Sequence, residues 1–453
     1  MTENLLIGWV AAPGITFLAL ALVWLLGWTP RERIVARLTA LVYFAMTVVG
    51  AVLGWTMYAE GTRTLATSTG HWFRAGEYHF EISLFVDRLS WPLMMLATVL
   101  VGIVAVFSIR YLHRDRGFFR FFTLLHLFAC GALLVFSAGS FDLLLGGWEL
   151  VGITSVLLIA YFDERRDPVR NAIRVFSFYR IADLGLLLGI FFLHSLAHTA
   201  EARDLLVGSW PDQTTPVSGS AATLIGLLLL LAAAGKSAQA PFSGWLPRAM
   251  EGPTPSSAIF YGAISVHLGA YLLLRAGPIL QAAPWAAAAV GAVGLVTALL
   301  ATLVHRVSID AKTSLAYAAM AQVGIIFVEI ALGFPRLALA HILGHAVVRA
   351  AQFLRAPSML HDYHRVHAAA GGHLGKTGAH YEGLLPQSVR TWLYNAGVER
   401  GYYDALLDRA VAGPVSRLAR WLEGLEPRRE TGGQVPPEHR TRAAVRSFEK
   451  VGL

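Results

Sequence analysis

Long apolar runs separated by short polar loops set the pattern of the chain. A run of about 20 apolar residues is long enough for a helix to cross a bilayer. The pattern therefore predicts an all-α polytopic membrane protein with about eleven transmembrane helices. The predicted spans lie near residues 5–27, 36–58, 87–108, 118–139, 141–161, 174–195, 221–246, 256–276, 283–304, 310–333 and 335–357.

Basic residues gather in the loops that follow every second predicted span. They are Arg31, Arg33, Arg37, Arg110, Arg114, Arg116, Arg120, Arg165, Arg166, Arg170, Arg248, His305 and Arg306. Because cytoplasmic loops are enriched in Lys and Arg, this alternation predicts an N-terminus outside and a cytoplasmic C-terminal tail. The segments 59–86 and 196–220 are then expected outside, and the expected location is the bacterial inner membrane.

The composition fits a membrane protein and argues against other classes. Hydrophobic residues make up 55% of the 453 residues and charged residues only 15%. The loop arginines explain the net charge of +8, so no nucleic-acid partner is expected. The single cysteine, Cys130, lies in an apolar run, which excludes an internal disulfide and does not suggest a thiolate metal site. No Lys or Arg precedes the first apolar segment, which favours a retained span over a cleaved signal peptide.

The stretch from Ala232 to Arg275 is the one around which the chain is organised. Lys236 interrupts a long apolar run, and Pro241 follows five residues later. Proline removes a backbone hydrogen bond, and a charge at bilayer depth costs roughly 2.5–3.5 kcal/mol. Both are tolerated where the broken backbone and the charge face protein or water, as they do along ion pathways. The sequence therefore predicts a broken helix near Lys236–Pro241 that carries a functional lysine.

Glu149 supplies the opposite charge. It lies roughly eight residues into its predicted span, about 12 Å deep at about 1.5 Å per residue. A carboxylate at this depth is satisfied either by a neighbouring hydroxyl or by a buried cation. We favour the second alternative and predict an ion pair of Glu149 with Lys236 that loads and unloads a proton.

Further ionisable residues lie within the predicted spans. Arg180 and Asp183, three positions apart, share a helix face and either form a local structural pair or tune the Glu149–Lys236 pair. His267, central in the eighth span, is either a proton relay or a hydrogen-bonded structural histidine. Glu329 lies nearer the expected outer end, and we interpret it as peripheral.

The last two predicted spans carry another polar group. Asp310 and Lys312 stand where a span begins, so Lys312 is either a relay or half of an interfacial charge pair. His341, His345 and Arg349 follow at intervals of four and line one face of the last span. An HxxxH pair on a helix fits a metal, but no carboxylate or cysteine near in sequence completes such a site. We therefore favour a hydrated polar stripe over a metal site.

Motifs for nucleotide, flavin, haem or iron–sulfur chemistry are absent from the sequence. It contains no Walker loop, no GxGxxG after a strand, no CxxC and no nucleophile elbow. The chain is thus expected to transport rather than to act as an enzyme by itself, and no catalytic residues are assigned.

The character of the chain changes after about residue 357. We predict an antiporter-like transmembrane domain at 1–357, a cytoplasmic or interfacial helical tail at 358–426, and a flexible C-terminus at 427–453. Within the tail, one helical face is apolar and predicts an amphipathic helix that lies on the membrane or docks a partner. Its apolar residues are Val411, Val415, Leu418, Trp421, Leu422 and Leu425.

Several motifs occur in order over residues 80–357. They read FVDRLSWPL, GGWELVGITSVLLI, YRIADLG, GKSAQAPFSGWLPRAMEGPTPSSA and SIDAKTSLAYAAMAQVG. Together they resemble the antiporter-like membrane subunits of respiratory complex I and of Mrp-type sodium/proton antiporters, of the subunit 5 type. The resemblance implies that Glu149 and Lys236 are the coupling ion pair and Lys312 a central relay. It also implies that His341 and His345 belong to a polar axis.

The chain departs from the pattern of that family at several points. Tyr261 stands where the family has a histidine after the PTP motif, and His267 appears one and a half turns later. Arg349, which cannot release a proton, stands where the family has a lysine after the HxxxH pair. Several distal spans, including one with the family's terminal channel lysine, are missing before a tail that is similar to the family's end. These departures argue against a complete complex I proton path.

The segment HAVVRAAQFLRAPSMLHDYH, in a shortened chain, resembles the DabB family, the membrane subunits of bacterial two-component inorganic carbon pumps. That resemblance implies a DabA-like cytoplasmic zinc protein, similar to β-carbonic anhydrases, as the partner, with no cofactor in this chain. The leading hypothesis is thus a proton- or sodium-conducting subunit that energises carbon dioxide or bicarbonate uptake. The alternatives are a proton-pumping subunit of an NADH or formate:quinone oxidoreductase and a subunit of a sodium/proton antiporter.

Overall fold

A computed structural model describes residues 2–28, 30–75, 78–358 and 383–402, together with residues 368, 417 and 421. It divides the chain into two compact units, Met1–Leu384 and Leu385–Leu453. The described part of the second unit holds α18 (Gln387–Val398) and a single 3-10 turn, Arg400–Tyr402. The predicted amphipathic helix lies almost wholly outside the described residues and stays a prediction, as do the predicted domain limits.

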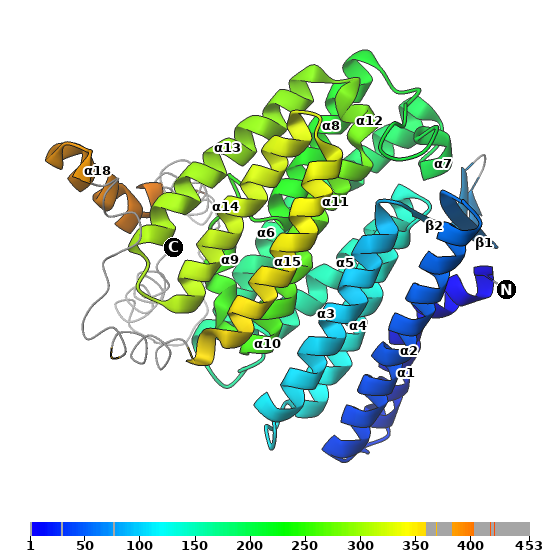
Figure 1. Ribbon diagram of the computed structural model, residues 1–453, viewed down its shortest axis with the longest axis horizontal. Coiled ribbons are helices and arrows are strands. Elements are labelled where there is room, and N and C mark those ends of the chain that lie inside the picture. Colours follow the sequence, from blue (N-terminus) through cyan, green and yellow to red (C-terminus); the bar gives the residue numbers. More distant parts are fainter. Residues whose placement is uncertain are drawn as a thin grey trace, which may run out of the picture. The chain divides into compact units, whose positions relative to one another are not determined.

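Eleven helices of the first unit are long and apolar enough to cross a membrane, among the residues that the structure describes. This confirms the predicted fold class (Figure 1). The spans are α1 (Thr2–Leu25), α2 (Glu32–Ala59), α3 (Ser90–Tyr111), α4 (Phe118–Ser137), α5 (Phe141–Ile159), α6 (Arg166–Phe192) continued by the π-turn Leu193–Ala197, α8 (Gly219–Lys236), the composite span Thr254–Arg275, α13 (Pro284–Val307), α14 (Ala311–Ala331) and α15 (Pro335–Arg355). Short helices connect them: α7 (Ala202–Leu205), α9 (Trp245–Arg248) and α12 (Gly277–Gln281).

A β-hairpin joins α2 to α3, which the sequence analysis did not predict. Strands β1 (Thr64–Ala75) and β2 (Tyr78–Asp87) pair antiparallel, with Thr64 opposite Asp87. The sequence carries a signal for the second strand, because apolar and polar residues alternate from Phe80 to Leu84, the period of a half-buried strand.

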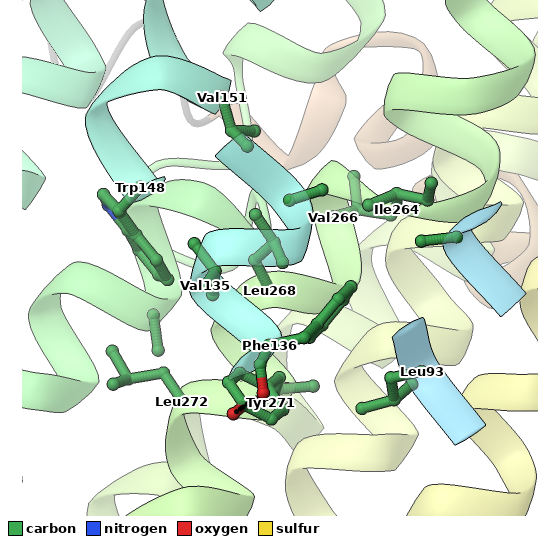
Figure 2. Packing of buried hydrophobic residues seen from close by; sticks show 14 of the residues in the cluster. Leu93, Val135, Phe136, Trp148, Val151, Ile264, Val266, Leu268, Tyr271 and Leu272 are labelled. Carbon is green, nitrogen blue, oxygen red and sulfur yellow. Dashed lines mark hydrogen bonds between the residues drawn. The ribbon is translucent and has the colours of Figure 1, made fainter. Parts of the chain in front are cut away.

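The composite span Thr254–Arg275 forms the centre of the bundle. It consists of α10 (Thr254–Ser256), a π-helical turn (Ser257–Ala263) and α11 (Ser265–Arg275), and all of its residues are buried. Figure 2 shows Leu268, Tyr271 and Leu272 of this span close to Val135 and Trp148 of α4 and α5. In the peripheral helices α2 and α13, only 28% of the residues in the apolar stretch are buried. These helices present large apolar side chains outward, as lipid-facing helices do.

Two of the spans are broken. Helix α8 ends at Lys236, Ala238 adopts a left-handed backbone with φ of 53°, and helix resumes only at Trp245. This confirms the broken helix predicted near Lys236–Pro241. The π-helical turn Ser257–Ala263 in the neighbouring span is a second interruption, which the sequence analysis missed. Such π segments are frequent at functional sites because they release backbone groups from the regular helical pattern.

Candidate functional site

Lys236 is enclosed by protein at the end of α8. Its side chain is completely buried, and its ammonium donates a hydrogen bond to the backbone carbonyl of Trp148 at 3.2 Å. The same ammonium lies 4.8 Å from the ring centre of Trp148 and 4.4 Å from that of Tyr179. Aromatic faces attract a cation without accepting its proton, so they hold the ammonium in place.

The carboxylate that faces Lys236 is Asp183 of α6. The distance from Lys236 Nζ to Asp183 Oδ1 is 4.0 Å, and Trp148 Nε1 donates to the same oxygen at 2.6 Å. Arg180, one turn earlier, donates to Asp183 Oδ2 at 2.8 Å and also forms a short ion pair with Glu149. The four charged side chains are therefore joined in one series of ion pairs, in the order Glu149, Arg180, Asp183 and Lys236.

This order corrects the predicted direct pair of Glu149 with Lys236. No ion pair joins these two side chains among the described residues; Glu149 binds Arg180 instead, and Asp183 takes the place next to Lys236. The physical reason is the rotation of α6, which points Arg180 toward α5 and Asp183 toward α8. Glu149 and Arg180 are also more open, with 37% and 40% of their side chains exposed, whereas Asp183 has 6%.

Small residues make this arrangement possible. A Cβ atom added to Gly235 would lie 2.0 Å from Ala182 Cβ, so glycine allows α8 to approach α6 closely. A Cβ atom added to Gly152 of α5 would lie 3.1 Å from Lys236 Nζ. Glycines at these two positions bring three helices together around the ammonium group.

Lys312 occupies a separate place near the start of α14. Its ammonium donates to the carbonyl oxygens of Met250 and Gly252 at 3.3 and 3.1 Å. These carbonyls belong to the segment between the two broken spans, so Lys312 satisfies backbone that has left the helical pattern. Asp310 caps α14 by accepting from Thr313 N at 2.7 Å. The structure thus connects Lys312 to the broken segment, and its predicted role as a relay stays a prediction.

His267, His345 and Arg349 meet across α11 and α15. Arg349 Nε donates to His345 Nε2 at 3.4 Å, and His345 Nδ1 lies 2.8 Å from His267 Nε2. His267 Nδ1 lies 2.6 Å from the carbonyl of Ala263, in the π-helical turn. Because Arg349 can only donate, each neutral ring must carry its hydrogen on Nδ1, and all three bonds point the same way.

His341, one turn before His345, makes different contacts. Its Nδ1 lies 2.9 Å from Glu329 Oε1 and its Nε2 lies 3.1 Å from Gln322 Oε1. The rings of His341 and His345 are 6.2 Å apart between centres. Glu329, interpreted as peripheral from the sequence, is therefore a direct partner of the predicted polar stripe.

A buried ion pair lies at one end of the composite span. Arg275 donates to both carboxylate oxygens of Asp87 at 2.7 and 3.0 Å, and both residues are almost fully buried. Burial raises the pKa of Asp87, but the Arg275 guanidinium and the hydrogen bonds from Ser90 more than offset this and hold it below its usual value. The pair ties the start of α3 to the end of α11. Sequence reasoning missed it because each residue stands at a span end, where charges are common.

The described residues contain no group of three or more His, Cys, Asp or Glu side chains placed to hold a metal ion. Most of the ionisable side chains described above lie in two groups, one around Lys236 and one around His341 and His345. The chemistry that such groups offer is proton binding and release across short hydrogen-bonded steps.

Comparison with known proteins identifies the fold. A family model described as NADH:quinone oxidoreductase/Mrp antiporter, TM, matches residues 138–374, just over half of the chain. The chain belongs to this family. A second model, described as NADH-ubiquinone oxidoreductase (complex I), chain 5 N-terminus, matches residues 72–122 of the chain.

Individual relatives agree with this assignment. The chain is 35% identical over 295 residues to NADH-quinone oxidoreductase subunit L of Mycobacterium tuberculosis (strain CDC 1551 / Oshkosh), an alignment that covers 65% of this chain and 46% of the relative. It is 33% identical over 291 residues to the chloroplastic NAD(P)H-quinone oxidoreductase subunit 5 of Lemna minor, covering 64% and 39%. The chain thus spans less than half the length of these curated relatives.

Solved structures show the same architecture. A chain of the Mrp complex from Dietzia sp. DQ12-45-1b superposes with a TM-score of 0.65 at 26% identity, covering 76% of this chain and 37% of that one. A chain of the membrane-bound sulfane sulfur reductase, an archaeal respiratory membrane complex, gives 0.65 at 18% identity, covering 77% and 70%. The antiporter-type fold expected from the resemblance is therefore confirmed, whereas the DabB assignment receives no support from these comparisons.

Proposed function

We propose that this antiporter-type subunit conducts protons across the membrane as part of a multisubunit complex. The observation that carries the proposal is the completely buried Lys236, held 4.0 Å from Asp183 at the end of a broken helix. An ionisable pair at this depth is costly to keep and is typical of ion pathways. The assemblies named for the relatives, an NADH-quinone oxidoreductase, the Mrp complex and a respiratory membrane complex, support this reading over carbon transport.

The mechanism rests on separation of the pair. Two unit charges about 4 Å apart attract by on the order of 4 kcal/mol at an effective dielectric of 20. Moving one charge through about 100 mV supplies about 2.3 kcal/mol. The potential thus supplies only part of the energy of separation, so we propose that a driving partner supplies the rest when Lys236 moves away from Asp183 and releases its proton. Arg180 then becomes the remaining cation beside Asp183, and its pairing with Glu149 weakens.

The proposed path joins two groups of polar side chains. The first group is the series of four charged side chains that begins with Glu149 and ends with Lys236. The second group is formed by the histidines of α11 and α15. Helix α11 packs against α8, because Gly269 lies against the carbonyl of Ala233 one turn before Lys236. We propose that protons pass between the groups at this contact. Sodium in place of protons, the outside location of the N-terminus and the bacterial inner membrane stay predictions.

The inorganic carbon hypothesis is the second candidate. Its sequence segment runs from His345 to His364 and extends beyond the described residues. No contact in the described residues favours it, and its zinc-protein partner is untested. It therefore stands as a prediction that partner identification decides.

The test is purification of the tagged chain from its native membrane in mild detergent, followed by mass spectrometry and proton-transport measurements on the reconstituted complex. Redox or Mrp-type subunits as the stoichiometric partners, with transport that Lys236→Met abolishes, support the proposal. A zinc protein similar to carbonic anhydrase as the partner supports carbon transport instead. Transport that is unchanged in Lys236→Met contradicts the proposed role of this chain.

A further inference from the structure

Glu329 is a partly buried carboxylate near the end of α14 that the path from Lys236 does not use. It lies two residues before the helix ends at Ala331, and only 14% of its side chain is exposed. One oxygen, Oε1, contacts His341, whereas the buried Oε2 has no hydrogen-bond partner among the described residues. A carboxylate oxygen without a partner at this place needs an explanation, because its burial is costly.

His341 is held between two oxygen atoms. Glu329 Oε1 faces its Nδ1 and Gln322 Oε1 faces its Nε2, at 2.9 and 3.1 Å. Both nitrogens donate at once only in the imidazolium ion. Gln322 and Glu329 are seven positions apart and so lie on the same face of α14. This geometry therefore fits a charged His341 with Glu329 as its counter-ion.

The neighbouring histidine, His345, has the hydrogen-bond geometry of a neutral ring. His345 Nε2 accepts a hydrogen bond from Arg349 Nε, so this nitrogen does not carry a proton of its own. The charged and ionisable groups near His341 are Glu329 from α14, His345 from α15 and His267 from α11. Through His345 the contact continues to His267 of α11. The proton that this cluster can exchange therefore resides on the pair of His341 and Glu329.

The position of the pair gives it a direction. Lys312 is the second residue of α14 and Glu329 the nineteenth, so they are about 25 Å apart along the helix at about 1.5 Å per residue. Helix α14 thus carries a cation at one end and a carboxylate at the other. The pair lies next to the turn Leu332–Phe334, where α14 ends and α15 begins, so Glu329 is within one helical turn of the end of its span.

We propose that Glu329 and His341 form a proton-binding dyad at the α14–α15 end of the path. The proton leaves His341 Nδ1 for Glu329 Oε1, passes to water from the carboxyl group, and is replaced on His341 by a proton from the interior. No other bond changes, and the pair is neutral overall before and after each cycle. This inference rests on the proposed function, since it gives the conducted proton its site near the surface.

The test compares Glu329→Gln, Glu329→Asp and Asp212→Asn in the purified, reconstituted complex. Asp212→Asn is the matched control, because it removes an exposed carboxylate 3.6 Å from Arg336 of the same helix α15. Diethyl pyrocarbonate modifies neutral imidazole and spares imidazolium. The tryptic peptide from Leu337 to Arg349 contains both His341 and His345, which fragmentation distinguishes.

We expect His341 to be labelled at least about tenfold faster in Glu329→Gln than in the wild type and in Asp212→Asn, because loss of the adjacent carboxylate disfavours the charged ring. Labelling of His345 should not change, and Glu329→Asp should protect His341 in part. Transport should fall by at least about tenfold in Glu329→Gln, as for loss of a positioned acid–base group. Partial protection in Glu329→Asp also separates loss of the dyad from loss of folding.

Equal labelling of His341 in the wild type and Glu329→Gln would overturn the dyad. So would normal transport in Glu329→Gln while Lys236→Met abolishes it, because the path would then work without Glu329. If Lys236→Met leaves transport unchanged, the proposed function fails, whereas the labelling result still decides whether Glu329 holds a charged His341.

Discussion

The carboxylate that faces Lys236 belongs to Asp183, at 4.0 Å, and not to Glu149. Glu149 is connected to Asp183 only through the guanidinium of Arg180, which binds both carboxylates. Two negative and two positive side chains therefore form one series of ion pairs, in which a cation can change its partner. A change of partner at one end alters the charge balance at the other, which is the property that a proton relay needs.

Asp183→Asn tests this order directly. It leaves a buried ammonium without its carboxylate, which costs about 3–5 kcal/mol for a broken buried pair. We expect much weaker assembly and loss of transport, whereas Glu149→Gln, at the more exposed end, should lower transport with near-normal assembly. The double variant Asp183→Asn with Lys236→Met should assemble better than Asp183→Asn alone, because it removes the unpaired charge. Identical thermal stability of the single and double variants would contradict the pair.

Gly152 tests the space that Lys236 requires. A Cβ atom there would lie 3.1 Å from the ammonium nitrogen, whereas nothing lies within 4 Å of a Cβ atom at Gly146 of the same helix. Gly152→Val should crowd the ammonium at a cost of about 1–3 kcal/mol and reduce transport. Gly146→Val carries the same helix-propensity change and should leave transport near the wild-type rate. Equal transport in the two variants would show that the space around Lys236 is not limiting.

The Asp87–Arg275 pair is expected to stabilise the fold rather than to conduct. Asp87→Asn should lower the free energy of unfolding by about 3–5 kcal/mol, because Arg275 remains buried and charged. Since Arg275 holds the pKa of Asp87 below its usual value near 3.9, this stabilisation is present above about pH 4 and is lost as the pH falls below it. Thermal unfolding in detergent, followed by tryptophan fluorescence from pH 7 to pH 3, measures both effects. A variant with the wild-type melting temperature and pH profile would refute this role.

Arg349 is expected to prevent His345 from taking up a proton. Arg349→Met removes the donor to His345 Nε2 and should speed the passive relaxation of a pH gradient in proteoliposomes. Arg349→Gln is the control, because its amide can still donate while the charge is lost, and its relaxation should stay nearer to the wild type. If both variants relax at the same rate, the hydrogen bond to His345 is not what limits the leak.

The sequence was sufficient for the spans, because each needs only a long apolar run, and for Lys236, because a charge inside such a run is conspicuous. The partner of Lys236 could not be predicted. It depends on the rotation of α6 where it packs against α8, at the close approach of Gly235 to Ala182, which no local sequence pattern predicts. Arg180 and Asp183 were recognised as sharing a face, but sequence spacing does not say which neighbouring helix that face meets.

Long-range pairs were also beyond sequence reasoning. Asp87 and Arg275 are 188 positions apart, and each stands where an interfacial charge is ordinary. Glu329 appeared peripheral for the same reason, and only the packing of α14 against α15 places it on His341. The π-helical turn at Ser257–Ala263 depends on packing around it, because its residues alone would also suit a regular helix.

The most direct test of the relay compares Lys236→Arg with Lys236→Met in the reconstituted complex, by the rate of proton uptake under an imposed potential. Arginine keeps the positive charge beside Asp183 but does not release its proton, whereas methionine removes the charge. If Lys236 works by exchanging a proton, both variants lose transport, and Lys236→Arg assembles at least as well as Lys236→Met. Proton uptake at the wild-type rate in Lys236→Arg would contradict the account, because a fixed charge would then be enough.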